Sequence, residues 1–121
     1  MIWKNIILVG FGGMIGSVLR YVTGLLIKHD GFPVATLVVN ILGSFVIGCV
    51  MAMAVKQANF GDWRLFLATG ICGGFTTFSA FSWECLQMIQ QQRFMAAAFY
   101  ISISLIAGIA ATFFGYWLIK Q

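Results

Sequence analysis

The residues with the clearest chemical potential lie in one stretch, residues 70–82, within the third apolar segment of the chain. This stretch combines glycines with the hydroxyl side chains of Thr76, Thr77, Ser79 and Ser82. Because both residue types weaken a continuous helix, we predict a helix break at membrane depth. Backbone groups freed there are tolerated only if they are buried in protein or serve a cavity or an ion. Unwound carbonyls suit a hard cation such as Na⁺, whereas hydroxyls, amide donors and helix N-termini suit an anion.

Two aromatic residues of this stretch, Phe78 and Phe81, are three positions apart. If the helix resumes here, their rings share one face. An aromatic pair at this spacing is most often part of a packed core. The positive edge of an aromatic ring can also meet an anion without binding it as tightly as a full charge does. Since conduction requires binding that is favourable but not deep, the pair is a candidate element of an anion pathway.

The first two apolar segments each contain one strongly polar side chain. Asn40 follows Thr36 by one helical turn, and its carboxamide either joins two helices or offers an amide donor to a passing anion. Arg20 lies inside the first segment, where an ionisable group is costly unless it faces protein, water or headgroups. Arg20 either extends its charge to the membrane surface or raises the positive potential of a vestibule. The sequence leaves both alternatives open for each residue.

Glu84 is the one carboxylate in the apolar segments, and it follows the stretch 70–82 closely. It can cap a helix, pair with Arg20 or line an entrance, and the sequence does not choose among these roles. The fourth segment carries a stripe of small and hydroxyl residues, mostly at four-residue spacing. A packing stripe and a track of donors look identical in sequence. The stripe consists of Ser102, Ser104, Gly108 and Thr112.

Four long apolar segments must position these residues. The chain has 121 residues, of which 61% are hydrophobic and 8% are charged, which excludes an ordinary water-soluble domain. Each segment reaches the roughly 20 residues that a helix needs to cross the hydrocarbon core. We predict an all-α integral membrane protein, a single four-span unit over residues 1–121, with both termini on one side. The expected spans are 3–27, 34–55, 63–89 and 94–119, separated by polar turns such as 28–31.

The basic residues and the cysteines exclude two classes of function. The net charge of +4 comes from scattered residues without a cluster, so we expect no nucleic-acid partner. The three cysteines lack CxxC spacing and predict neither a disulfide framework nor a cysteine metal site.

The basic residues also give only a weak preference for one orientation in the membrane. Asp62 offsets part of the charge on the side of the termini. With so small a bias the chain can insert in both directions and then assemble as an antiparallel pair. Lys4, Lys56, Arg64 and Lys120 fall on one predicted side, and Lys28 and Arg93 on the other, with Arg20 near that second side.

Three motifs together resemble the Fluc (CrcB) fluoride channel family. They are GSVLRY at 16–21, TLVVN at 36–40 followed by Gly43 and Gly48, and GGFTTFSAFS at 73–82. The resemblance implies a fluoride-selective channel, not an enzyme, that exports cytoplasmic fluoride passively and so lowers its toxicity. It implies an antiparallel, dual-topology homodimer in the bilayer of the cell inner membrane, with two pores and a central structural Na⁺.

The same resemblance implies roles for individual residues. The backbone carbonyls of Gly73 and Thr76 would hold the Na⁺. The rings of Phe78 and Phe81 would form an aromatic box that fluoride passes, with the amide of Asn40 beside them.

A vestibule and a polar track complete the implied pathway. Arg20 would lie near the vestibule. The sequence departs from the pattern of the family at Ala80, where many relatives have threonine, and at Gly108, where serine is common. The implied track includes Thr36, Ser79 and Thr112.

Two other functions compete with the channel. A dual-topology multidrug exporter of this size should carry a membrane-embedded acid in its first span, and this first segment has none. A scaffold subunit without transport activity would use the small and hydroxyl residues for packing alone.

Overall fold

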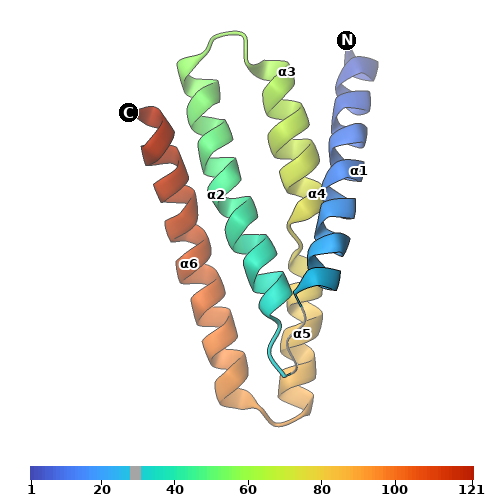
Figure 1. Ribbon diagram of the computed structural model, residues 1–121, viewed down its shortest axis with the longest axis vertical. Coiled ribbons are helices and arrows are strands. Elements are labelled where there is room, and N and C mark those ends of the chain that lie inside the picture. The colour runs from blue at the N-terminus through green and yellow to red at the C-terminus, as the bar shows by residue number, and fades with distance from the viewer. Residues whose placement is uncertain (28–30) are drawn as a thin grey trace.

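The computed structural model describes residues 1–27 and 31–121. The expected polar turn at 28–31 and the charge of Lys28 therefore lie largely outside the described residues. Every regular element of the described chain is helical, and four stretches are long and apolar enough to cross a membrane (Figure 1). Three of these stretches are uninterrupted: α1 (Ile2–Leu26), α2 (Val34–Lys56) and α6 (Phe94–Lys120). The four spans predicted from composition are confirmed within one or two residues at each end.

The third span, Gly61–Gln90, is built from several helical pieces. A first half runs through α3, a π-helical stretch η1, and α4, and a second half is formed by α5. The pieces are α3 (Gly61–Arg64), η1 (Leu65–Cys72), α4 (Gly73–Phe75) and α5 (Phe78–Gln90).

The helices form two close pairs. α2 packs along α6 and runs in the same direction, while α1 packs on η1 and α4 (Figure 1). α5 continues the third span away from α1 and contacts α6 instead (Figure 1). Both termini lie at the same end of the molecule, as four spans require.

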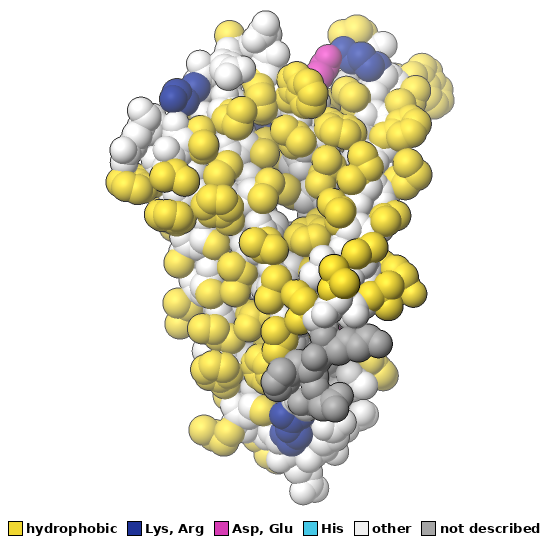
Figure 2. Space-filling view, viewed as in Figure 1, with side chains coloured by type: hydrophobic (Ala, Val, Ile, Leu, Met, Phe, Trp, Pro, Cys, Tyr) yellow, Lys and Arg dark blue, Asp and Glu magenta, His cyan; other side chains and the backbone are white. Residues whose placement is uncertain are grey.

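The outer surface is apolar over most of its height. Figure 2 shows hydrophobic side chains over the middle of the molecule, with the Lys and Arg side chains of this face at its two ends. Large apolar residues such as Phe11, Leu105 and Phe113 are more than half exposed. Such a surface suits lipid, where each helix satisfies its own backbone hydrogen bonds.

Glycines allow α1 to approach the third span closely. A Cβ atom on Gly12 would lie 2.8 Å from the Cα of Gly70, and one on Gly74 would lie 3.0 Å from the Cα of Gly13. Separations this short leave no room for a side chain. Gly12 with Gly16, and Gly70 with Gly74, form two GxxxG pairs whose lack of side chains lets the two helices pack this closely.

Two small clusters of buried side chains fix opposite ends of the bundle. Near the termini, Val50 and Phe60 pack with Ala68. At the other end, Met88 and Tyr100 pack with Cys85 and Ala97, and Phe81 leans on them. The interruption of the third span falls between these clusters.

Candidate functional site

The third span loses its helical backbone at two residues, Thr76 and Thr77. Thr76 has φ −79° and ψ 155°, and Thr77 has φ −150° and ψ 120°, both in the extended region. The Oγ1 of Thr77 accepts a hydrogen bond from the amide of Ala80 at 3.1 Å and so caps α5. The predicted break is confirmed, but Gly70, Gly73 and Gly74 lie in the helical pieces before it.

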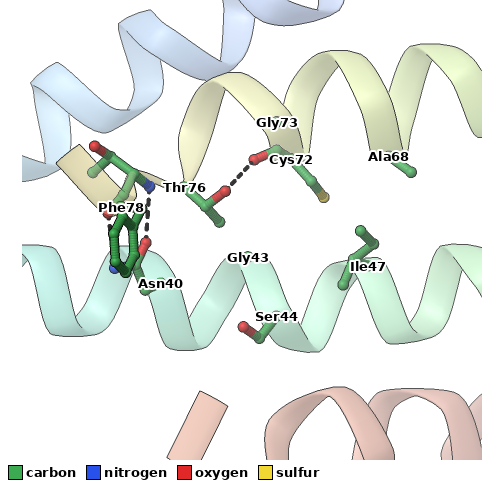
Figure 3. A pocket seen from close by; sticks show the side chains of 10 residues that line it. Asn40, Gly43, Ser44, Ile47, Ala68, Cys72, Gly73, Thr76 and Phe78 are labelled. Carbon is green, nitrogen blue, oxygen red and sulfur yellow. Dashed lines mark hydrogen bonds between the residues drawn. The ribbon is translucent and has the colours of Figure 1, made fainter. Parts of the chain in front are cut away.

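Asn40 of α2 binds the peptide groups of the break. Its Nδ2 donates to the carbonyl of Thr77 at 3.2 Å, and its Oδ1 accepts from the amide of Thr77 at 3.0 Å. Figure 3 shows the carboxamide facing the non-helical backbone from below. One side chain thus replaces two hydrogen bonds that the helix has given up, which a buried backbone requires. Of the two alternatives for Asn40, the structure establishes the one that joins two helices.

This arrangement leaves two carbonyls without their helical donors. In a continuous helix the carbonyl of Gly73 would accept from the amide of Thr77, and that of Thr76 from the amide of Ala80. Those two amides donate instead to Asn40 and to the hydroxyl of Thr77. The two oxygens that the resemblance assigned to a cation are therefore free of the bonds that an unbroken helix would impose.

An open cavity of about 360 Å³ lies beside the break, between α2 and the third span. Its polar groups gather at the break, and its apolar groups lie toward the end with the termini (Figure 3). The cavity is lined by Asn40, Gly43, Ser44, Ile47, Ala68, Cys72, Gly73, Thr76, Thr77 and Phe78.

The aromatic pair lies directly after the break. The ring centroids of Phe78 and Phe81 are 5.6 Å apart, which confirms that the two rings share a face. Phe78 is 77% exposed, so one side of this pair is open in the single chain. The ring of Tyr100 lies 4.9 Å from that of Phe81 and extends the pair to three rings.

Glu84 joins three helices through hydrogen bonds. Its Oε2 accepts from the hydroxyl of Thr36 at 2.7 Å, and its Oε1 accepts from the hydroxyl of Tyr100 at 2.8 Å. Glu84 also lines a second cavity at the end of the molecule far from the termini. Of the three roles open to it in the sequence, the structure supports the entrance and adds a link between α2, α5 and α6.

Arg20 reaches toward the third span. Its Nε donates to the carbonyl of Gly74 at 3.2 Å, and the side chain is half-buried. Arg20 lines a cavity of about 120 Å³ together with Thr36, Thr77 and Ala80. Its guanidinium therefore contributes positive charge close to the break.

The expected track residues do not meet at one point. The hydroxyls of Ser79 and Thr77 are 3.2 Å apart beside the break. Thr112 donates to the carbonyl of Ser44 at 3.1 Å, further along α2. The hydroxyl of Thr36 donates to Glu84 instead. Between these levels the buried hydroxyl of Ser104 has no hydrogen-bond partner among residues 1–27 and 31–121.

Thr77 and Tyr100 are site residues that sequence reasoning missed. Thr77 was visible in the motif, but its double pairing with Asn40 depends on long-range packing. For Tyr100 a signal existed, because a phenolic hydroxyl inside an apolar span needs an acceptor, and Glu84 is the one carboxylate within the spans expected from the sequence.

Comparison with known proteins gives one consistent family. The family described as CrcB-like protein, Camphor Resistance (CrcB), matches residues 7–116. A fluoride-specific ion channel FluC of Azobacteroides pseudotrichonymphae is 48% identical over 95% of each chain. Proteins of the same name from Leptospira interrogans and Thermus thermophilus are 42% and 45% identical, the first over 98% of this chain and 96% of its own and the second over 95% and 94%.

Proposed function

The chain belongs to the CrcB family, and we therefore propose that it conducts fluoride passively and selectively, in the direction of export from the cytoplasm. It is a multi-pass membrane protein, and its family and the names of its relatives identify an ion channel rather than an enzyme. The observation that carries the proposal is the 48% identity, over 95% of both chains, with a fluoride-specific channel.

The chemistry around the break supports an anion as the conducted ion. Arg20 brings a guanidinium to this level, and Asn40 offers an amide with a second hydrogen beyond the one given to Thr77. The ring edges of Phe78 and Phe81, directly after the break, add weak positive groups. Many mild donors replace the water of a small anion without trapping it.

We place this function in an antiparallel homodimer with two pathways. The cavity beside the break is open, and Phe78 at its rim is 77% exposed, so a second copy would complete the enclosure. The weak charge bias between the two ends permits the opposite insertion that such a pair needs. In that assembly the whole chain serves as one channel subunit.

Dual insertion is directly measurable in proteoliposomes. A cysteine introduced at Lys120, on a background with the three native cysteines replaced by serine, reports the side on which this end lies. An impermeant maleimide added outside should label about half of the protein, and the rest should react only after the membrane is opened. Complete labelling from one side would reject the antiparallel pair.

The freed carbonyls of Gly73 and Thr76 suit a central Na⁺. Both residues line the cavity beside the break, and carbonyl oxygens are ligands that hard cations accept. When bound, Na⁺ would supply a fixed positive charge that holds the two broken spans together. Protein purified with N-methylglucamine in place of Na⁺ should lose both thermal stability and fluoride flux, and indifference of both quantities to Na⁺ would count against this site.

Ion efflux from liposomes tests the proposed function. Vesicles loaded separately with potassium fluoride and potassium chloride are triggered with a K⁺ ionophore, and ion-selective electrodes follow the released anion. Rapid loss of fluoride with retention of chloride is the expected result. Loss of both anions would reject the selectivity. Retention of both by well-folded protein would favour the multidrug exporter or the scaffold subunit.

A further inference from the structure

A second cavity lies at the end of the molecule opposite the termini. It has a volume of about 270 Å³ and is formed where the start of α2, the last turns of α5 and the turn into α6 meet. Glu84 lies along its wall, and Gln87, Gln91 and Arg93 contribute polar groups. The cavity is open to the outside and is therefore a mouth, not a sealed void.

A continuous line of side-chain contacts joins this mouth to the aromatic pair. The ring of Phe81 contacts that of Tyr100 at 4.9 Å, and the hydroxyl of Tyr100 donates to Glu84 at 2.8 Å. Phe32 packs edge-on against Tyr100 at 5.4 Å and lines the mouth as well. The mouth and the aromatic pair are thus connected by a path of polar and aromatic contacts along α5.

A tight turn fixes Arg93 at this mouth. The amide of Arg93 donates to the carbonyl of Met88 at 2.8 Å, and Gln91 donates to Gln87 at 3.0 Å. Between them Gln92 has φ 60°, a left-handed conformation that is uncommon for a residue with a side chain. This tight turn joins the end of α5 to α6, and Arg93 is the N-cap residue of α6.

Among the described residues that line the mouth, Glu84 and Arg93 carry opposite charges. An anion that moves along this path meets the carboxylate of Glu84, and a like charge in a partly desolvated site raises the barrier to its passage. The guanidinium of Arg93 lies on the wall of the same cavity and raises the local concentration of anions. If Arg93 only anchored the helix end at the headgroups, ion flow would not depend on its charge, so the two roles differ in a measurable way.

We propose that Arg93 sets the rate at which fluoride enters through this mouth. Its positive charge offsets the negative charge of Glu84 and draws fluoride toward the path along α5. This inference rests on the proposed fluoride conduction. In the antiparallel pair each membrane face carries one such mouth, so the effect of Arg93 holds for current in both directions.

Single-channel fluoride currents in neutral planar bilayers test the proposal with Arg93→Gln, Arg93→Lys and the control Lys120→Gln. Lys120 is exposed, and its loss changes the net charge equally. At about 20 mM ionic strength, Arg93→Gln should lower the current about threefold, and the difference should shrink at about 0.5 M, where screening is strong. Arg93→Lys and Lys120→Gln should stay close to the parent protein.

The remaining outcomes overturn the proposal in distinguishable ways. Equal currents for Arg93→Gln and Lys120→Gln would show that Arg93 only anchors the helix end. A loss that persists at high salt and is not rescued by lysine would show a structural role. Absence of fluoride current from the parent protein would remove the proposed function itself, and the inference with it.

Discussion

The two halves of the third span contact the rest of the protein in opposite ways. The half before Thr76, formed by η1 and α4, packs against α1, and the closest contacts join backbone atoms at glycine residues. The half after Thr77, formed by α5, makes its close contacts through polar and aromatic side chains that reach α2 and α6. A single span therefore changes both its partner helix and its kind of contact at the break.

The first half of the third span thus fixes the position of the span, and the second half carries its polar groups. Backbone contact at Gly12 and Gly16 fixes the first half by shape alone and presents few polar groups. The second half holds Glu84 in bonds to Thr36 and Tyr100, and Thr77 at the break is bonded to Asn40. Substitutions in the first half should therefore affect folding, and substitutions in the second should affect conduction.

The largest expected effect is that of Gly16→Ala. A Cβ at this position meets the carbonyl oxygen of Ile71 and the amide of Phe75, and backbone atoms cannot rotate away. Overpacking of this kind costs about 3 kcal/mol or more, so most of the folded protein should be lost. Yield of monodisperse protein in detergent measures this. Gly10→Ala is the matched control, because a Cβ on Gly10 meets nothing within 4 Å. Equal yields for both variants would contradict the anchoring role.

Asn40→Asp should act mainly on conduction. The carboxylate still accepts from the amide of Thr77, but it no longer donates to the Thr77 carbonyl and it adds negative charge near the path. Fluoride efflux from liposomes should fall by about tenfold or more. Asn59→Asp is the control, since Asn59 is exposed near the end of the molecule. Unchanged efflux in Asn40→Asp would show that the bond from Asn40 to the Thr77 carbonyl is not needed for conduction.

Tyr100→Phe should have the smallest effect of the three. It removes one hydrogen bond to Glu84 and keeps the ring that packs on Phe81. The free energy of unfolding, measured by thermal denaturation, should fall by about 1 kcal/mol, which is in the usual range for hydrogen bonds between membrane helices. Tyr21→Phe, at an exposed position of α1, should change little. A loss as large in Tyr21→Phe would show that the effect is not specific to the link with Glu84.

The spans were predictable because composition alone decides them. Long apolar runs in a chain with 8% charged residues leave few alternatives to membrane helices. The break was predictable from the run of hydroxyl residues at 76–82, because their side chains compete for backbone hydrogen bonds. The glycines gave an ambiguous signal, since the same residue type serves breaks and close packing, and here it serves packing.

The partners of the polar side chains were not predictable in the same way. Arg20 had two alternatives in the sequence, and its bond to Gly74 follows from how deeply α1 seats on the third span. Glu84 had three, and its acceptance from Thr36 and Tyr100 depends on α2 and α6 being neighbours. Tertiary packing determines which helices are neighbours, and no local sequence pattern encodes that packing.

We infer that conduction depends on the half of the third span after the break. The most direct test compares fluoride currents of Phe81→Ile with those of Phe66→Ile, which makes the same change in the first half. We expect Phe81→Ile to abolish most of the current in a protein that still elutes at the size of the parent protein, while Phe66→Ile retains it. Retained current in Phe81→Ile, or an equal loss in both variants, would contradict the claim.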